Sequence, residues 1–286
     1  MLSSSSAKAG PADLRVEPLD GVLDEVERAL RTQLDRGSLV RKRRTLGAPT
    51  DRGTWVRVER RCLDKIGSQG WNGTECAALL EGVSKPQWHR GIEWSQPGDP
   101  MMWRADETDL LPSAPVGSSV LAAEPALPDD WWQALNTSLD ALVEQHTRRV
   151  ATPDTVMITQ SRVAQAIRRF LPGDVDTTVQ RWLPAHADLN WANVTGPEFC
   201  LFDWEDWGVA PQGLDAASLW GSSLAVPALA ERVRRERTDD LESRDGKLMV
   251  LFVCAKILVP DAHPEDPRLE PARHIAAQVA EDLQRD

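Results

Sequence analysis

An ordered set of acidic and amide side chains follows two short apolar runs in the second half of the chain. Asp188 and Asn193 lie in the stretch HADLNWANV, and Asp203 comes directly after the apolar run FCLF. Mg²⁺ favours oxygen ligands and usually takes one or two carboxylates, with phosphate oxygens and water completing its shell. Asn193 and Asp203 suit that task, and Asp188 is then available to accept a proton from an attacking hydroxyl. This spacing indicates a site that holds a divalent metal against a triphosphate and orients a hydroxyl for attack.

Two short strands are needed to position these side chains. The sequence predicts a buried strand over residues 182–184 and a second apolar strand over residues 199–202. Because a turn joins them, we expect Asp188 and Asp203 at the same end of a hairpin, with Asn193 between them. Asp and Asn are common in turns, so each residue alone has a simple alternative as a solvated turn residue. That alternative does not explain the ordered combination.

The combination carries a resemblance to a known family. The pattern His186-x-Asp188-x-x-x-x-Asn193, followed by Asp203, resembles the catalytic loop and metal-binding Asp of the protein-kinase-like fold. More narrowly, HADLNWANV, LFDWEDWG and GLDAASL are together similar to the aminoglycoside phosphotransferase family, which includes antibiotic kinases and choline kinase. The resemblance implies that Asp188 is the catalytic residue and that Asn193 and Asp203 bind magnesium. It also implies that His186 and Asp215 support the loop.

The resemblance further implies a fold and a division of the chain. We expect an α+β, bilobal protein-kinase-like fold, with a small antiparallel-sheet N-lobe and a mainly helical C-lobe that carries the catalytic hairpin. Residues 1–12 are expected to form a disordered tail, residues 13–110 the nucleotide-covering N-lobe, and residues 111–286 the C-lobe. Residues 111–128 are rich in Pro, Ser and Ala, which is typical of a linker.

The expected N-lobe contains a strand with a candidate phosphate-binding cation. Alternation of apolar and polar residues predicts a strand over residues 54–60. In the family, a Lys on this strand contacts phosphates and pairs with a Glu on the next helix. The matching residue here is Arg57, which keeps the charge but has a larger, planar donor group. Arg61 is the second candidate if the register differs, and Glu59 is an alternative partner for Arg57 on the strand surface.

Two further segments complete the expected nucleotide site. Residues 73–81 resemble the family's E-x-x-A-L-x-x-L helix, so Glu75 is the candidate partner of Arg57, the alternative being an ordinary surface acid. The segment MMWRADETD follows in the order expected of the hinge between lobes. Backbone near Ala105 to Glu107 is therefore expected to face adenine.

The implied cofactors are ATP or GTP and Mg²⁺, and the implied partner is a small-molecule hydroxyl acceptor. The net charge of −11 disfavours a nucleic-acid partner, which would need a basic face. An acidic protein is compatible with a cationic acceptor such as an aminoglycoside. Glu205, Asp206, Asp239 and Asp240 are candidate contacts for it, although solvated acids are the better interpretation of the last two. The chain is expected to be a monomer or a homodimer.

Cysteine spacing and hydropathy indicate the compartment. The four Cys show no CxxC or CxxH pairing, which is typical of free thiols in a reducing compartment. The first residues lack the apolar core of a signal peptide. The longest apolar run, Leu248 to Leu258, is too short for a membrane span and carries Lys256. We therefore expect a cytoplasmic protein with no membrane segment.

Two other classes of function stay open at this point. The first is a pseudokinase-like binding or regulatory protein, which is favoured by Arg57 in place of Lys and by a loop with few glycines. The second is a metal-dependent phosphohydrolase using Asp188 and Asp203. That class predicts a further cluster of His or Asp, and the sequence contains none.

Overall fold

The computed structural model describes residues 13–96, 98–170 and 175–285. Contacts within the chain divide the described residues into two units. Unit 1 contains those of Met1–Ala78 and Pro86–Pro112, and unit 2 contains those of Leu79–Lys85 and Ser113–Asp286. Residues 79–85, which the sequence placed in the N-lobe, therefore group with unit 2. The tail expected at residues 1–12 lies outside the described residues.

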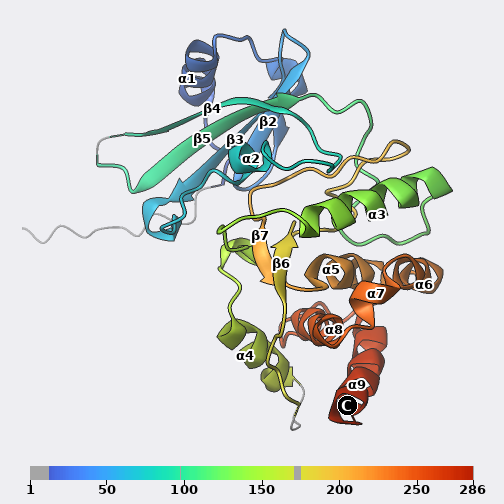
Figure 1. Ribbon diagram of the computed structural model, residues 1–286. Coiled ribbons are helices and arrows are strands. Elements are labelled where there is room, and N and C mark those ends of the chain that lie inside the picture. Colours follow the sequence, from blue (N-terminus) through green and yellow to red (C-terminus); the bar gives the residue numbers. More distant parts are fainter. Residues whose placement is uncertain (1–12, 97, 171–174, 286) are drawn as a thin grey trace, which may run out of the picture. The chain divides into compact units, whose positions relative to one another are not determined.

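Unit 1 is built on a five-stranded antiparallel sheet with the strand order β1-β2-β3-β5-β4 (Figure 1). The strands are β1 (Val40–Arg41), β2 (Thr45–Pro49), β3 (Thr54–Cys62), β4 (Trp88–Ser95) and β5 (Met101–Asp109). The helices are α1 (Asp20–Leu30) and α2 (Gly73–Ala77), with 3-10 turns η1 (Arg36–Ser38) and η2 (Leu63–Lys65). The small antiparallel sheet expected for the first lobe is thus confirmed.

Helix α1 and one face of the sheet form the core of unit 1. Leu23, Val26 and Leu30 recur at helical spacing along α1, and all three are buried. They pack in one cluster with Val56 and Val58 of β3, which alternate on the same face of the strand. The opposite face of β3 carries charged residues, as the alternation in the sequence predicted.

The hinge expected near Ala105 and Glu107 is not at those residues. Both lie inside β5, which pairs with β3 on one side and β4 on the other. Their backbone groups therefore belong to a continuous sheet rather than to an adenine-facing segment. The expectation rested only on the order of the segments along the chain. The strand ends at Asp109, and the boundary between the units falls after Pro112.

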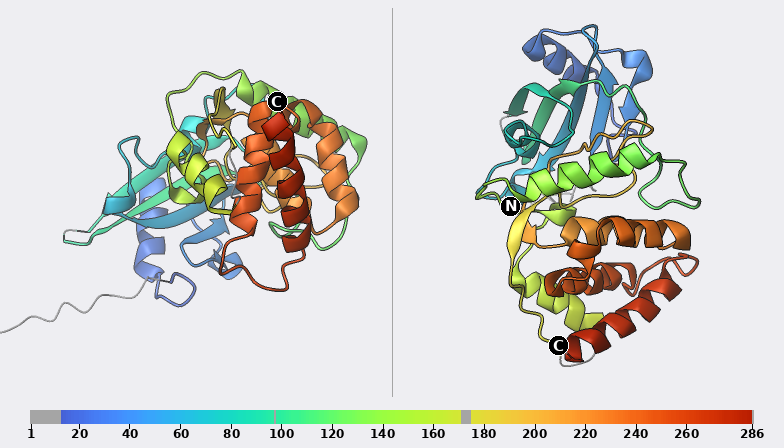
Figure 2. Two further views of the ribbon diagram at one scale, coloured as in Figure 1. Left: turned by 90° about the horizontal axis from the view of Figure 1, so that it is seen from below. Right: turned by 45° about the vertical axis from the view of Figure 1, so that its right-hand side comes forward.

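Unit 2 is mainly helical, as expected for the second lobe. Its helices are α3 (Asp129–Val143), α4 (Gln160–Phe170), α5 (Leu214–Ser223), α6 (Pro227–Glu236), α7 (Thr238–Leu241), α8 (Arg244–Ile257) and α9 (Leu269–Arg285), with the 3-10 turn η3 (Pro153–Thr155). The almost wholly buried helix α8 contacts α4, α5 and α9 (Figure 2). This arrangement follows from the sequence, because α8 contains the longest apolar run in the chain.

A two-stranded antiparallel sheet joins the helices to residues 186–193, the functional loop. Strand β6 (Trp182–Ala185) pairs with β7 (Gly208–Pro211). The strand predicted over residues 199–202 is wrong as a full strand, since only an isolated bridge joins Val194 to Leu201. Here the chain folds back tightly, with the Thr195 N–H donating to the Cys200 carbonyl oxygen at 3.0 Å, which leaves little length for a ladder.

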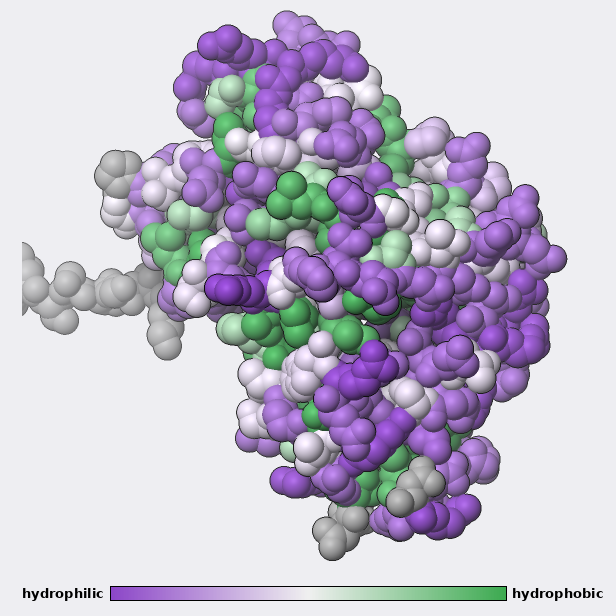
Figure 3. Space-filling model, in the orientation of Figure 1, coloured by the Kyte–Doolittle hydropathy of each residue, from purple (hydrophilic) through white to green (hydrophobic). Residues whose placement is uncertain are grey.

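Hydrophilic residues dominate the visible surface, and apolar residues appear there in small groups (Figure 3). Among the described residues, no helix has the length and apolar character needed to cross a membrane.

Candidate active site

His186 links the functional loop to the segment that ends at Asp203. The His186 side chain is fully buried and lies edge-on to Trp204, with ring centroids 4.6 Å apart. Its Nε2 lies 3.0 Å from the Phe202 carbonyl oxygen, and its Nδ1 lies 3.3 Å from the Asp188 backbone N–H. A neutral ring that donates from Nε2 and accepts at Nδ1 satisfies both contacts. Burial lowers the pKa of His186 and so favours this neutral form.

Asp215 fixes the backbone of the loop from the first turn of α5. Its carboxylate accepts N–H groups from His186 at 2.7 Å and from Ala187 at 2.8 Å. Ala187 has a φ of +69°, a left-handed conformation that side chains other than glycine rarely adopt. Burial raises the pKa of Asp215, while the two backbone N–H donors oppose that rise. Asp215 thus holds the loop in a backbone conformation that it would not favour alone.

Asp188 and Asn193 are brought together within the loop. The Asn193 Nδ2 donates to the Asp188 backbone oxygen and to its Oδ2, both at 2.8 Å. The Asn190 side chain adds a contact of 3.2 Å to the Asp188 Oδ1. The Asp188 side chain is nevertheless exposed, whereas Asn193 is buried. The carboxylate is held in one orientation and is still open to a ligand.

Asp203 reaches the same end of the tight hairpin as Asn193. The backbone N–H of Phe202 donates to the Asn193 carbonyl oxygen at 3.0 Å, so Asp203 follows directly after the residue opposite Asn193. Asp203 has a φ of +70°, which turns the chain there. The short hairpin therefore places the three predicted residues near one another, even though residues 199–202 do not form a full strand.

The electrostatics of Asp188 suit proton transfer. Although Asp188 has exposed surface, the protein atoms around its carboxyl group exclude much of the water there. This desolvation, followed by the negative charge of Asp203, raises the pKa of Asp188 to about 6, and Glu205 adds to this rise. The hydrogen bond from Asn193 and the charge of Lys256 act in the opposite direction. A carboxylate whose pKa lies close to neutrality is an effective acceptor of a proton from a hydroxyl.

The donor atoms at this end of the hairpin fit magnesium. The Asn193 Nδ2 faces Asp188, and among the described residues no hydrogen bond reaches its Oδ1. Asn193 and Asp203 thus offer an amide oxygen and a carboxylate, which are ligands that Mg²⁺ prefers. The described parts of the chain contain no group of three or more His, Cys, Asp or Glu residues that could hold a metal ion. A metal here needs further oxygens from a nucleotide and water.

Trp191 anchors the middle of the loop. Its side chain is fully buried and stacks on Trp131 of α3, with ring centroids 5.9 Å apart. Its indole Nε1 donates to the Ser223 Oγ of α5 at 3.0 Å. The sequence did not single out this tryptophan, although its place between Asp188 and Asn193 was a usable signal. Asn190 was missed for the same reason.

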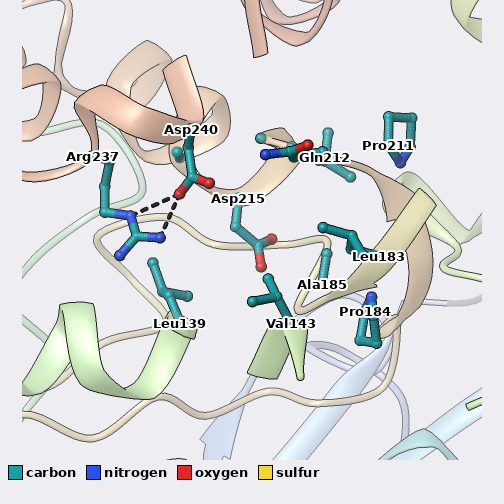
Figure 4. A pocket seen from close by; sticks show the side chains of 13 residues that line it. Leu139, Val143, Leu183, Pro184, Ala185, Pro211, Gln212, Asp215, Arg237 and Asp240 are labelled. Carbon is teal, nitrogen blue, oxygen red and sulfur yellow. Dashed lines mark hydrogen bonds and ion pairs between the residues drawn. The ribbon is translucent and has the colours of Figure 1, made fainter. Parts of the chain in front are cut away.

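The acidic residues proposed as contacts for a cationic acceptor have different environments. Asp206 is buried and accepts a hydrogen bond from the Thr152 hydroxyl at 2.6 Å. Asp240 pairs with the buried Arg237 and lies beside Asp215 in a small pocket behind the loop (Figure 4). Asp239 is exposed. Glu205 is half-buried and acts electrostatically on Asp188, so it is the acid of this set with a described effect on the site.

Lys256 was noted in the sequence as a charge within an apolar run. It is exposed, whereas residues 248–255 of the same helix are buried. Its Nζ pairs with Asp154 at 2.8 Å, and its charge lowers the pKa of Asp188. The sequence could not place it near Asp188 because α8 follows more than fifty residues later.

Arg57 and Glu75, which were predicted to pair in unit 1, each contact another residue. The Glu75 carboxylate accepts from Nη2 of Arg104 at 3.0 Å, and the Arg57 Nη1 lies 3.4 Å from Glu59. The pairing of Arg57 with Glu75 is thus corrected, and the alternative of Glu59 as its partner on the strand is confirmed. The helix expected over residues 73–81 ends at Ala77.

Glu107 also has its hydrogen-bond and ion-pair partners within unit 1. It is almost fully buried and accepts from the Thr54 hydroxyl at 2.6 Å and from the Arg90 Nε at 2.7 Å. Arg52 lies 3.3 Å from the same carboxylate. Desolvation opposes the charged form, but these partners hold the pKa of Glu107 below its usual value. The arrangement is that of a buried ion pair on the sheet.

Comparisons with known proteins agree with the architecture. A scan against protein-family models gives no match, and a search of curated proteins gives none either. Solved structures do match. The amicoumacin kinase hAmiN, in complex with AMP-PNP, Ca²⁺ and Ami, is 11% identical with a TM-score of 0.54, over 92% of this chain and 94% of that chain.

Two further structures are similar. APH(2")-IIia, in complex with GDP and kanamycin, is 14% identical with a TM-score of 0.55, over 94% of this chain and 98% of that chain. The streptomycin–ATP–APH(2")-IIa ternary complex is 10% identical with a TM-score of 0.51, over 84% and 88% respectively. The chain therefore has the kinase-like fold of these proteins, and the fold class expected from the resemblance is confirmed.

Proposed function

We propose that this protein is a magnesium-dependent phosphotransferase that moves the γ-phosphoryl group of ATP or GTP to a hydroxyl of a small molecule. The observation that carries the proposal is the arrangement around Asp188. Its carboxylate is oriented by Asn193 at 2.8 Å, stands within the electrostatic reach of Asp203, and belongs to a loop fixed by Asp215. Phosphoryl transfer depends mainly on positioning and charge neutralisation, and this arrangement supplies both.

Each residue has a defined task in this reaction. Asp188 orients the acceptor hydroxyl and takes its proton on the carboxylate. Asn193 and Asp203 would hold Mg²⁺ through oxygen atoms, and the ion would supply positive charge for the nucleotide phosphates. Arg57 supplies a positive charge to the phosphates. His186 and Asp215 keep the loop in place without reacting.

The acceptor belongs to the class of small hydroxylated compounds, and cationic antibiotics are the first group to test. Glu205 adds negative charge near Asp188, which favours a cationic acceptor. Two proteins of the same fold were solved with kanamycin and with streptomycin. Aminoglycosides are therefore included, together with other hydroxylated antibiotics, choline and sugars.

The direct test is an acceptor screen that measures release of ADP or GDP. Purified protein with Mg²⁺ and nucleotide is assayed against this panel, and an active acceptor raises the release rate above the rate with water alone. Asp188→Asn is the control, because it removes the proton acceptor and keeps a similar shape. We expect it to lower transfer by about 10²–10⁴-fold while nucleotide affinity changes little. Equal turnover by the variant would reject the role of Asp188.

A second candidate function is nucleotide binding without transfer. It is favoured by Arg57 at the position where the family has Lys. It is also favoured by the loop between β2 and β3, which has few glycines and turns tightly at Gly53, where φ is +72°. This reading predicts calorimetric binding of Mg²⁺–ATP or Mg²⁺–GTP by a protein that gives no phosphorylated product with any acceptor in the panel.

A further inference from the structure

Three arginines share one face of the unit 1 sheet. Arg57 and Arg61 lie two positions on either side of Glu59 along β3, and alternation puts all three side chains on the same face. Arg104 of β5 is the cross-strand neighbour of Glu59, and Asp106 is the neighbour of Arg57. Positive and negative side chains therefore alternate both along β3 and across to β5.

Arg104 is held by acidic side chains of β5 and α2. Its Nε and Nη2 donate to the two carboxylate oxygens of Asp106 at 2.8 and 2.7 Å, and its Nη2 also contacts Glu75 of α2 at 3.0 Å. Arg104 is only 7% exposed. Asp106 also accepts from the Trp88 indole at 2.9 Å, which fixes it further. The Glu75 carboxylate of α2 thus pairs with Arg104, a structural cation on β5.

The packing around this group requires a glycine on β4. Gly91 pairs with Asp106, and a Cβ added to it would lie 2.6 Å from the Asp106 Oδ1 and 3.1 Å from the Arg104 Nη2. Both distances are shorter than ordinary van der Waals contacts. The network of Arg104 is therefore tightly enclosed, and this arginine has little room to reorganise around a ligand.

The other two arginines each contact one oxygen of the Glu59 carboxylate. The Arg57 Nη1 lies 3.4 Å from one oxygen, and the Arg61 Nη2 lies 3.3 Å from the other. Arg61 also stacks on Trp71, with its guanidinium carbon 4.8 Å from the ring centroid, and its side chain is 13% exposed. The Arg57 side chain is 28% exposed, the largest fraction of the three. Arg57 is the arginine on this face that a ligand reaches most readily.

We infer that Glu59, within the same strand as Arg57, positions this arginine for the nucleotide phosphates, while Glu75 of α2 does not. This inference rests on the proposed function. Glu59 is buried, and β3 is paired on both sides over this region, so the carboxylate is held rigidly. A guanidinium that contacts a buried carboxylate has fewer orientations to lose when a phosphate binds. The anchor is consequently set by the sheet and is independent of the short helix α2.

The test compares Glu59→Gln with Glu75→Gln, which remove one carboxylate charge each from neighbouring networks. Binding of Mg²⁺–ATP and of adenosine is measured by calorimetry, with GTP and guanosine in their place if GTP is the nucleotide bound. We expect Glu59→Gln to weaken Mg²⁺–ATP by about tenfold, as for one misplaced charge-assisted hydrogen bond, and to leave adenosine within about twofold. Glu75→Gln should weaken Mg²⁺–ATP by less than about threefold and lower the thermal midpoint.

Two additional variants keep the test decisive. Arg57→Gln should reproduce the loss of Mg²⁺–ATP affinity without a loss for adenosine. Glu59→Asp keeps the charge but moves the carboxylate, and it replaces Glu59→Gln if that variant does not fold. A larger loss for Glu75→Gln than for the Glu59 variant, or an equal loss for ATP and adenosine, would overturn the inference. Wild-type protein that binds neither nucleotide would instead reject the proposed function.

Discussion

The choice of an amide at position 193 follows from its contacts. Its Nδ2 donates twice to Asp188, to the backbone oxygen and to the carboxylate. A carboxylate at 193 would have no hydrogen to donate and would repel Asp188. An Asn instead orients Asp188 with one end and offers an oxygen to a cation with the other. One side chain thereby links the proposed proton acceptor to the proposed metal ligands.

Asp203 is the residue whose removal should separate metal binding from the rest of the site. Asp203→Ala takes away the only carboxylate assigned to Mg²⁺, so we expect nucleotide affinity in the presence of Mg²⁺ to fall by about tenfold or more. Calorimetry with and without EDTA is the measurement. In EDTA, the wild type should drop towards the affinity of the variant.

The control for this experiment is Asp239→Ala, which removes an exposed acid from α7. It lowers the net negative charge by the same amount but should leave metal-dependent affinity unchanged. Unaltered Mg²⁺-dependent binding by Asp203→Ala would assign the metal to other ligands.

At the scale of elements, the N-terminal turns of two helices hold the chain on either side of β6. Asp215 of α5 accepts the N–H groups of His186 and Ala187 after the strand. Asp245 of α8 accepts those of Gln180 and Arg181 before it, at 2.9 and 2.6 Å. Both carboxylates are buried. They form a matched pair, one next to the candidate catalytic residue and one at the far end of the strand.

Replacing these acids should separate stability from catalysis. In Asp215→Asn the side chain keeps one acceptor oxygen, so one of the two buried N–H groups loses its partner and stability falls by about 1–3 kcal/mol. In Asp245→Asn the oxygen in the place of Oδ2 can still accept both N–H groups, so we expect a smaller loss. Urea unfolding with an unchanged m-value measures this loss. Asp215→Asn should also lower turnover strongly, because Ala187 loses a contact that holds its left-handed backbone. Asp245→Asn should retain most turnover. Similar turnover for both variants would argue against a specific role of Asp215.

Trp191 and Ser223 connect the loop to α5 in a way that a double-mutant cycle can measure. Ser223→Ala removes the acceptor of a fully buried indole N–H and should cost about 1–3 kcal/mol. Trp191→Phe removes that donor, while the Ser223 hydroxyl can still donate to the Leu219 carbonyl oxygen at 2.8 Å. Ser223→Ala should therefore cost much less in the Trp191→Phe background, with a coupling of about 0.5–3 kcal/mol. Additive losses in urea unfolding would show that the hydrogen bond contributes nothing.

The elements also explain what could be predicted from the sequence. The contact of Asp188 with Asn193 was predictable because only five positions separate them in one tight loop. The pairing of Glu75 with Arg104 was not, since it depends on the register of β3 with β5 and on where α2 lies. The hinge near Ala105 to Glu107 was inferred from segment order, which does not show that Arg104 and Asp106 lie inside a paired strand. Their mutual hydrogen bonds allow Arg104 to be buried and Asp106 to be half-buried in β5.

At the scale of the whole molecule, the two units have separate cores, so their stabilities need not be equal. Unit 1 depends on α1 against one face of a sheet, whereas unit 2 depends on α8 among other helices. Cysteines report on both units. Cys62 and Cys76 lie in unit 1, and Cys200 and Cys254 lie in unit 2. Their reactivity can therefore follow the opening of each unit in one sample.

Cys254 should be the slowest cysteine to react. It is fully buried in α8, and burial raises its pKa to about 12, so only about one thiol in ten thousand is ionised at pH 8. Cys200 of the same unit is half-buried and serves as the internal comparison. Alkylation at pH 8, followed by mass spectrometry of the peptides, should label Cys200 in the native protein and Cys254 only as urea unfolds unit 2. Labelling of both at one rate without urea would contradict the buried position of α8.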